Sequence, residues 1–245
     1  MKRPDVEPLP ERLPDDLPEG LPEGDEKVAA VRSMFDTIAP RYDLVNRVMT
    51  FRMDVRWRRH TIRELALPAG SVVLDLAAGT GDFCRELAAA GLVPLGFDLS
   101  YGMLAAARTE APLVQADILR LPAPTAAADG VTCGFALRNL VELGAFFDEL
   151  GRVVRPGGRI ALLEVAEPPN RVLRWGHGIY FGKVVPRIGG LLSDPSAYRY
   201  LPKSVAYLPE PDAMVARLAD AGFSDVRREL LSTGISQLIT ATRDA

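Results

Sequence analysis

Cysteine and histidine are scarce in this chain of 245 residues, which has two of each. Cys84 and Cys133 lie far apart and form no CxxC pair, so the spacing of a zinc site is absent. So few cysteines also favour a reducing compartment over an oxidising one. We therefore expect no metal site.

An excess of basic residues is also absent, since the formal net charge is −3. Without a basic field there is no reason to expect a nucleic-acid partner. No apolar run approaches the roughly 18 residues that span a bilayer. The N-terminus is charged and rich in proline, and it lacks the apolar stretch of a signal peptide. We expect a cytoplasmic protein and leave open peripheral contact with the inner face of the cell membrane.

What the chain does contain is enough apolar sequence for one sizeable domain. Hydrophobic residues make up 48% and charged residues 25%, and the length fits a single α/β domain with additions. Residues 1–26 differ, with six prolines and nine acidic residues. Because this composition cannot bury enough surface to offset chain entropy, we predict a disordered tail at 1–26 and a folded domain at 27–245.

The stretch SVVLDLAAGTGD at 71–82 is the centre of that domain. A buried apolar strand turns through Gly79 and Gly81 into a helix, which is the start of a nucleotide-binding α/β unit. Glycine lets the backbone pass close to a ligand. A dinucleotide fingerprint would place a third glycine where this chain has Cys84, which argues against a pyrophosphate at the helix start.

The rest of the chain alternates between strand and helix patterns. Strands are predicted at 93–97, 112–116, 131–136 and 159–165, and helices at 103–109 and 143–154. This rhythm indicates a parallel sheet with helices on both faces. Two late strands, near 226–231 and 236–242, suggest an antiparallel hairpin at the sheet edge. Three helices precede the sheet at 27–38, 42–49 and 54–67, the last with Asp54 as its N-cap.

Two aspartates follow strands at the edge that carries the glycine loop. Asp98 follows the second strand, where a carboxylate can accept hydrogen bonds from both ribose hydroxyls. Asp117 follows the third strand and could accept one from an adenine amino group. Each also has an ordinary explanation, Asp98 as a turn residue and Asp117 as a cap. Together with the loop they favour a nucleoside-type ligand.

Several motifs resemble those of a known family. DLAAGTGD (75–82), GFDLSYGML (96–104) and RVVRPGG (152–158) are similar to class I S-adenosylmethionine-dependent methyltransferases. More narrowly, the chain resembles the ubiquinone/menaquinone biosynthesis C-methyltransferases. The motifs that carry this second resemblance are MFDTIAPRYD (34–43), FALRN (135–139), AYRYLPKSV (197–205) and AGF (221–223). The likeness runs from about Val31 to the C-terminus.

The resemblance implies a Rossmann-like fold and S-adenosylmethionine as cofactor. Its sheet would be mostly parallel and seven-stranded, with one antiparallel edge strand and helices on both faces. We expect the cofactor to contact Asp75, Gly79, Thr80, Gly81, Asp98, Asp117, Ile118 and Gly134. Gly134 stands where the family often has a cofactor-binding serine, so that side-chain contact is absent or replaced.

The resemblance also implies an acceptor and three catalytic residues. Arg138, Asn139 and Tyr42 would line the acceptor, with Arg138 stabilising a developing phenolate. The expected reaction is C-methylation of demethylmenaquinol to menaquinol. A benzoquinol of the ubiquinone pathway or another lipophilic phenol is the alternative acceptor, and a non-catalytic nucleoside-binding module is the alternative class. Structural roles remain open, a strand-end pair for Arg138 and Asn139 and core packing for Tyr42.

Residues 167–205 break the α/β rhythm and are predicted to form a substrate or lid insertion. The helices at 27–70 are predicted to lie over the site. The insertion is basic and aromatic, so it could cover a polyprenyl tail and touch anionic lipid heads. It could equally be a plain lid or the contact of a homodimer. His177 within it is a candidate base or a loop residue, whereas His60 is expected to be solvated or packed on its helix.

Overall fold

The computed structural model describes residues 24–185, 187 and 204–245. Helix α1 (Gly24–Ile38) includes the last three residues of the predicted disordered tail. The rest of that prediction, residues 1–23, lies outside the described residues. The predicted insertion at 167–205 is described only at 167–185, 187 and 204–205.

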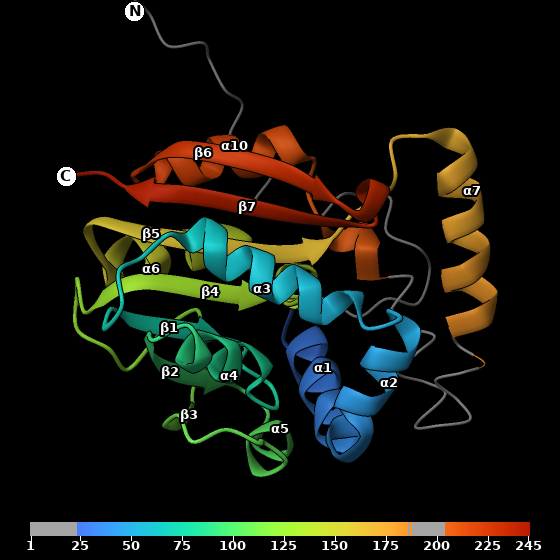
Figure 1. Ribbon diagram of the computed structural model, residues 1–245, viewed down its shortest axis with the longest axis horizontal. Coiled ribbons are helices and arrows are strands. Elements are labelled where there is room, and N and C mark those ends of the chain that lie inside the picture. Colours follow the sequence, from blue (N-terminus) through green and yellow to red (C-terminus); the bar gives the residue numbers. More distant parts are fainter. Residues whose placement is uncertain (1–23, 186, 188–203) are drawn as a thin grey trace, which may run out of the picture.

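Within the described residues, seven strands form one sheet in the order β3-β2-β1-β4-β5-β7-β6 (Figure 1). They are β1 (Val72–Leu76), β2 (Val93–Asp98), β3 (Leu113–Gln115), β4 (Ala128–Gly134), β5 (Val154–Val165), β6 (Phe223–Leu231) and β7 (Ser236–Arg243). Strand β1 pairs in parallel with β2 and β4, and β7 pairs antiparallel with β5 and with the outermost strand β6. The predicted α/β fold is confirmed, with the antiparallel strand lying next to the edge.

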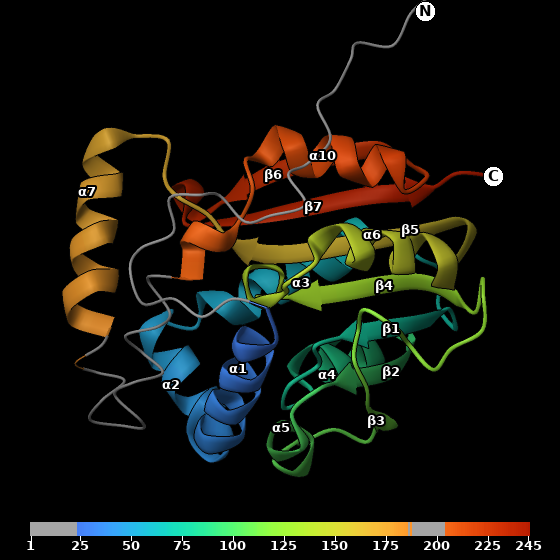
Figure 2. The same cartoon turned by 180° about the vertical axis from the view of Figure 1, so that it is seen from behind.

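Strand β1 shows how the sequence places helices on both faces. Because side chains alternate along a strand, Val73 points to one face and Leu74 and Leu76 point to the other. Val73 joins an apolar cluster with residues of α3 and α4, whereas Leu74 and Leu76 join one with residues of α6 and α10. These helices are α3 (Met53–Leu65), α4 (Asp82–Ala89), α6 (Leu143–Val153) and α10 (Pro211–Asp220). Figures 1 and 2 show the two layers from opposite sides.

The first two helices lie at the end of the sheet where β1 and β4 finish (Figures 1 and 2). Helix α2 (Tyr42–Met49) has the predicted bounds. A third apolar cluster joins α1 and α2 to α5 (Tyr101–Ala105) and to the segment after α7 (Arg171–Ile179). It contains Ile38, Val45, Met49, Met103 and Val185. Helices far apart in the sequence therefore pack around one end of the sheet.

The prediction that Asp54 caps α3 is wrong. The helix begins at Met53, after Arg52 in a left-handed conformation. Asp54 lies inside the first turn, where its carboxylate accepts hydrogen bonds from Thr50 Oγ1 (2.7 Å) and Arg58 Nη1 (2.6 Å). Both partners lie four residues away along the chain, so a local ion pair takes the place of the expected backbone cap.

In the part of the chain that the structure describes, no helix is both long and apolar enough to cross a membrane.

Candidate active site

Two adjoining cavities lie at the carboxyl ends of the parallel strands, where ligands of open α/β sheets bind. The first lies between α1 and the segments that follow β1, β2, β3 and β4. The second is lined by α2, α3, the segment after β4, the end of α7 and the helical turn that follows α7. Phe35, Tyr42 and Phe135 line both cavities. Ligands in the two cavities would therefore meet at this shared wall.

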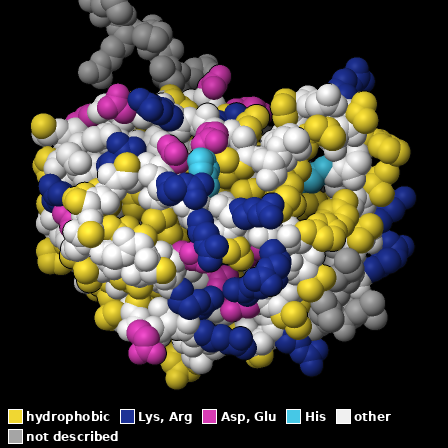
Figure 3. All heavy atoms as spheres, in the orientation of Figure 1, with side chains coloured by type: hydrophobic (Ala, Val, Ile, Leu, Met, Phe, Trp, Pro, Cys, Tyr) yellow, Lys and Arg dark blue, Asp and Glu magenta, His cyan; other side chains and the backbone are white. Residues whose placement is uncertain are grey.

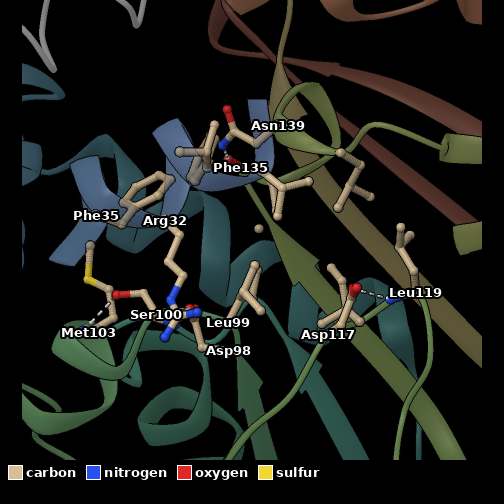
Figure 4. Close-up of a pocket in the computed structure, with 18 of the residues that line it drawn as sticks. Arg32, Phe35, Asp98, Leu99, Ser100, Met103, Asp117, Leu119, Phe135 and Asn139 are labelled. Atoms are coloured by element: carbon tan, nitrogen blue, oxygen red, sulfur yellow. Dashed lines mark hydrogen bonds between the residues drawn. The ribbon is translucent and has the colours of Figure 1, made fainter. Parts of the chain in front are cut away.

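Asp98 ends β2 and lines the first cavity (Figure 4). Its carboxylate accepts hydrogen bonds from the backbone N–H groups of Gly79 (2.7 Å) and Ser100 (2.8 Å). Burial raises the pKa of Asp98, and these two donors oppose that rise. Each donor uses a different oxygen, and a carboxylate oxygen can accept more than one bond. Both oxygens can therefore also accept from a ligand that lies against Gly79.

Thr80 and Gly81, expected to contact the cofactor, do not line the first cavity. The Thr80 hydroxyl donates to Asp43 Oδ1 on α2 (2.5 Å), so its side chain is turned toward the N-terminal helices. Gly81 has a φ of +81°, and a Cβ there would lie 2.6 Å from Thr109 Cγ2. These two residues shape the loop and hold it to its neighbours.

Asp75, also expected to contact the cofactor, is buried behind the loop rather than in the cavity. It shares a face of β1 with Val73, which directs it toward α4. Its carboxylate accepts hydrogen bonds from Thr132 Oγ1 (3.0 Å) and Cys84 Sγ (3.3 Å). Burial raises the pKa of Asp75 to about 7. The aspartate joins β1, β4 and α4 beneath the loop.

Asp117, Ile118 and Gly134 all line the first cavity. Asp117 is exposed, and its Oδ1 accepts from the backbone N–H of Leu119 (2.9 Å), so it is both a turn residue and part of the wall. A Cβ at Gly134 would lie 2.6 Å from Phe83 Cε2. The absence of a serine at this position therefore matches the packing of Phe83 against the end of β4.

Helix α1 contributes residues to the first cavity that the sequence analysis did not assign to a site. Val28, Val31 and Phe35 line the first cavity, and the Arg32 side chain extends toward Asp98 and Ser100 (Figure 4). Arg32 follows Val31 and lies three residues before Phe35, a spacing that places it near the same helix face. That spacing was the available signal for a polar group in the wall.

Asp36 joins α1 to the loop after β2. Its Oδ1 accepts hydrogen bonds from Ser100 Oγ (2.5 Å) and from the backbone N–H of Gly102 (2.8 Å). The hydrogen bond from Ser100 is the main reason that the pKa of Asp36 is lowered. A Cβ at Gly102 would lie 2.8 Å from the Asp36 backbone, so glycine permits this close approach. The contact closes α1 over the first cavity.

Arg138 lies in η2 (Leu137–Asn139) and lines the second cavity. Its Nη1 donates to Glu164 Oε1 (2.5 Å) and to the Phe135 carbonyl (2.7 Å), and its Nε donates to Ser204 Oγ (3.2 Å). Glu164 is fully buried, and Arg138 is only 5% exposed. The guanidinium is therefore fixed in a buried ion pair at the cavity wall.

The other two predicted catalytic residues occupy different places. Tyr42 lies in the shared wall, and burial raises the pKa of its hydroxyl. Asn139 lines the first cavity but not the second, with Nδ2 3.5 Å from the Phe135 carbonyl oxygen. The structure thus brings Tyr42 and Arg138 to one cavity and places Asn139 beside the other.

A group of ion pairs ties the N-terminal helices to the glycine loop. Asp82, at the start of α4, lies 3.0 Å from Arg47 Nη2 on α2 and 3.3 Å from Arg58 Nη2 on α3. Arg58 also pairs with Asp54 at 2.6 Å, and both line the second cavity. Buried charge pairs of this kind fix geometry more than they add stability. Sequence reasoning did not find the two ion pairs of Asp82, because their partners come from separate helices.

Comparison with known proteins decides the family. A family model described as the ubiE/COQ5 methyltransferase family matches residues 23–243. The chain belongs to this family. It is 44% identical over 221 residues to a demethylmenaquinone methyltransferase of Thermus thermophilus, a match that covers 86% of this chain and 100% of the relative. It is 40% identical over 221 residues to a ubiquinone/menaquinone biosynthesis C-methyltransferase of Syntrophotalea carbinolica, covering 86% and 93%. The resemblance inferred from the motifs is confirmed.

Solved structures share the fold of this ubiE/COQ5 family member. Magnesium protoporphyrin IX methyltransferase from Synechocystis, solved with bound SAH, has a TM-score of 0.59 and 21% identity. The match covers 89% of this chain and 100% of that one. Phosphoethanolamine N-methyltransferase 2 from Haemonchus contortus, in complex with S-adenosyl-L-methionine, has a TM-score of 0.59 and 15% identity, covering 78% and 53%. At these identities the likeness concerns the fold.

Proposed function

We propose that this protein transfers a methyl group from S-adenosylmethionine to a ring carbon of demethylmenaquinol, giving menaquinol. One observation supports the proposal beyond family membership. The first cavity, with the buried carboxylate of Asp98 beside the glycine loop, adjoins a mostly apolar second cavity, and the two share a wall of Phe35, Tyr42 and Phe135. The first suits a nucleoside-type donor and the second a lipophilic ring. Relatives about 40% identical that are named demethylmenaquinone methyltransferase favour naphthoquinol over benzoquinol.

The residues of the first cavity fit an adenosyl ligand. Asp98 can accept from both ribose hydroxyls, because each of its oxygens already in use has further capacity. Asp117 and Ile118 lie where the third strand ends and would hold the adenine ring between a polar and an apolar group. Gly79 lets the ligand approach the loop backbone. Bound there, S-adenosylmethionine supplies an electrophilic methyl group on a sulfonium.

The residues of the second cavity would align the acceptor and stabilise its charge. The shared aromatic wall holds the ring close to the donor, and alignment alone can lower a barrier by several kcal/mol. The acceptor carbon becomes nucleophilic as a ring hydroxyl loses its proton. Arg138 would stabilise the oxyanion that develops, held in place by Glu164. Tyr42 would be wall and hydrogen-bond partner. Asn139, which lines the adjoining first cavity, would fix a water or a substrate oxygen from that side.

The reaction can be tested directly with purified protein, S-adenosylmethionine and demethylmenaquinol kept reduced in detergent micelles. We expect mass spectrometry to show menaquinol, and a lower kcat/KM with a demethylated benzoquinol of the same tail length. A higher kcat/KM for the benzoquinol would move the assignment to the alternative acceptor. S-adenosylhomocysteine binding without any methylated product would favour the non-catalytic module.

The face of α7 that lies away from the second cavity suits contact with a lipid surface, and we propose that it makes one. On this helix, Val172 and Trp175 are 74% and 71% exposed. Figure 3 shows hydrophobic side chains together with Lys and Arg on the side of the molecule where α7 lies. Arg171 and Arg174 are exposed on the same helix. Apolar groups flanked by cations favour anionic lipid surfaces, where a polyprenyl quinol would be found.

A variant with Val172→Ser and Trp175→Ser is expected to bind anionic vesicles at least about 10-fold more weakly, because a large apolar side chain contributes about 1.5–3 kcal/mol on burial. Vesicle flotation measures this effect. The control is Leu44→Ser, an exposed apolar residue on α2, which should leave binding unchanged. If instead the double variant binds vesicles normally but a wild-type dimer becomes monomeric in light scattering, this face is a homodimer contact.

A further inference from the structure

His177 belongs to the wall of the second cavity and carries an unsatisfied ring nitrogen. Its Nε2 atom is buried and, in the described part of the chain, has no hydrogen-bond partner. The residue lines the cavity that Arg138 and Tyr42 also line. A buried polar atom without a partner is uncommon in a native structure. Such an atom, in a residue that lines a cavity, suggests that a ligand supplies its partner once the imidazole ring turns toward the cavity.

The local structure fixes this side chain rather than leaving it on a loop. Asn170 caps α7 by accepting from the backbone N–H groups of Val172 (2.9 Å) and Leu173 (3.2 Å). The helix continues into a π-helical turn, η3 (Tyr180–Val184), of a kind common at functional sites. The Tyr180 hydroxyl donates to the Met49 carbonyl on α2 (2.7 Å). The Phe181 ring lies 4.3 Å from the imidazole ring, centre to centre.

The surroundings keep His177 in its neutral form near pH 7. Burial lowers its pKa, and the charge of Glu167 opposes that shift. Among the described residues, the other charged or titratable groups around the cavity are Tyr42 on α2, Asp54 and Arg58 on α3, Arg138 on η2 and Tyr180 on η3. Asp54 is paired with Arg58, and Arg138 with Glu164. A neutral imidazole can accept a hydrogen bond and then a proton.

We infer that His177 binds the reacting hydroxyl of the acceptor through Nε2 and takes its proton as the ring carbon attacks. This inference rests on the proposed function and names the base for it. The O–H bond breaks and its proton goes to Nε2. The electron pair moves through the ring into a new C–C bond to the methyl group, and the S–C electron pair stays on sulfur. The ring carbon then loses its hydrogen as a proton, the imidazolium returns its proton to oxygen, and one proton is released overall.

The test compares His177→Gln and His177→Phe with His60→Gln. His60 is the chain's other histidine and is paired with Glu229 at 2.7 Å outside the cavity. General-base loss costs about 10²–10⁴-fold, so we expect both His177 variants to lose at least about 100-fold in kcat. His60→Gln should keep the wild-type rate. In wild type, kcat/KM should fall as the pH is lowered, because His177 becomes protonated. This fall should disappear in the His177 variants only.

A binding measurement separates proton transfer from folding and from turnover. The probe is a 2,3-dialkyl-1-naphthol, which carries the hydroxyl but has no free carbon to methylate beside it. His177→Gln keeps an oxygen that can accept a hydrogen bond, so we expect the probe to bind within about threefold of wild type. His177→Phe should bind it at least about 10-fold more weakly, the order of one lost hydrogen bond. Calorimetry with S-adenosylhomocysteine should be unchanged in all variants.

Two results would overturn the inference while leaving the function intact. One is a His177→Phe enzyme that retains a third or more of wild-type kcat together with the fall in kcat/KM at low pH. The other is equal probe affinity in His177→Phe and wild type. Wild-type protein that yields no methylated quinol would instead overturn the proposed function. If His177→Phe does not fold, His177→Gln and the two pH profiles decide the question.

Discussion

Replacing Arg138 with alanine is expected to lower kcat by about 10²–10³-fold, the usual loss for one donor to a developing oxyanion. The described hydrogen bonds of its guanidinium use Nε and Nη1, so we expect Nη2 to meet the acceptor oxygen. The change also leaves the fully buried Glu164 without its ion-pair partner. Breaking a buried ion pair from one side costs about 3–5 kcal/mol. Steady-state kinetics and urea unfolding measure the two losses.

A double variant separates catalysis from stability. Arg138→Met with Glu164→Gln removes both charges, and the glutamine oxygen can still accept from the backbone N–H of Val165, as Glu164 Oε1 does at 2.8 Å. Replacing both members of a buried pair is often nearly neutral. We therefore expect most of the unfolding free energy to return while kcat stays low. A double variant that regained both stability and turnover would show that Arg138 acts only as a structural partner of Glu164.

The fold was predictable because its signals are local in the sequence. The apolar run before Gly79, the break at the glycines and the helical spacing after them each need only a few neighbouring residues. Asp98 was predictable for the same reason: it ends a strand at the edge where such sheets bind ligands. The bounds of α2 follow from Pro40 before it and its own apolar spacing.

Thr80 and Asp75, both predicted to contact the cofactor, bind partners that are distant in the sequence. Thr80 donates a hydrogen bond to Asp43, 37 residues away, and Asp75 accepts one from Thr132, 57 residues away. Neither partner can be identified from spacing, so both residues were expected at the cofactor. Arg138 lines the second cavity, and no sequence motif identified Glu164 as its ion-pair partner. The hydrogen-bond partner of a polar side chain depends on tertiary packing, and short sequence motifs carry no information about that packing.

The second large effect is expected when Asp98 is replaced, and it concerns the affinity for the cofactor. Asp98→Ala is expected to weaken S-adenosylhomocysteine binding by at least about 100-fold in calorimetry. Hydrogen bonds to a charged group contribute about 1.5–3 kcal/mol each, and two ribose hydroxyls would donate to this carboxylate. The change also leaves the N–H groups of Gly79 and Ser100 without the acceptor that now holds them at 2.7 and 2.8 Å. Loss of loop order and loss of ligand contacts therefore act in the same direction.

Asp117→Ala is the matched control, because Asp117 lines the same cavity at the end of the next strand. Asp117 is exposed, and one of its oxygens already accepts from Leu119. Water can replace its remaining contact, so we expect a loss of no more than about 10-fold, the order of a single net hydrogen bond. Asp98→Asn should fall between the two, since its amide nitrogen must face one of the two backbone N–H groups. A larger loss for Asp117→Ala than for Asp98→Ala would mean that the ribose lies at the third strand, and the adenosyl group would have to be reversed in the cavity.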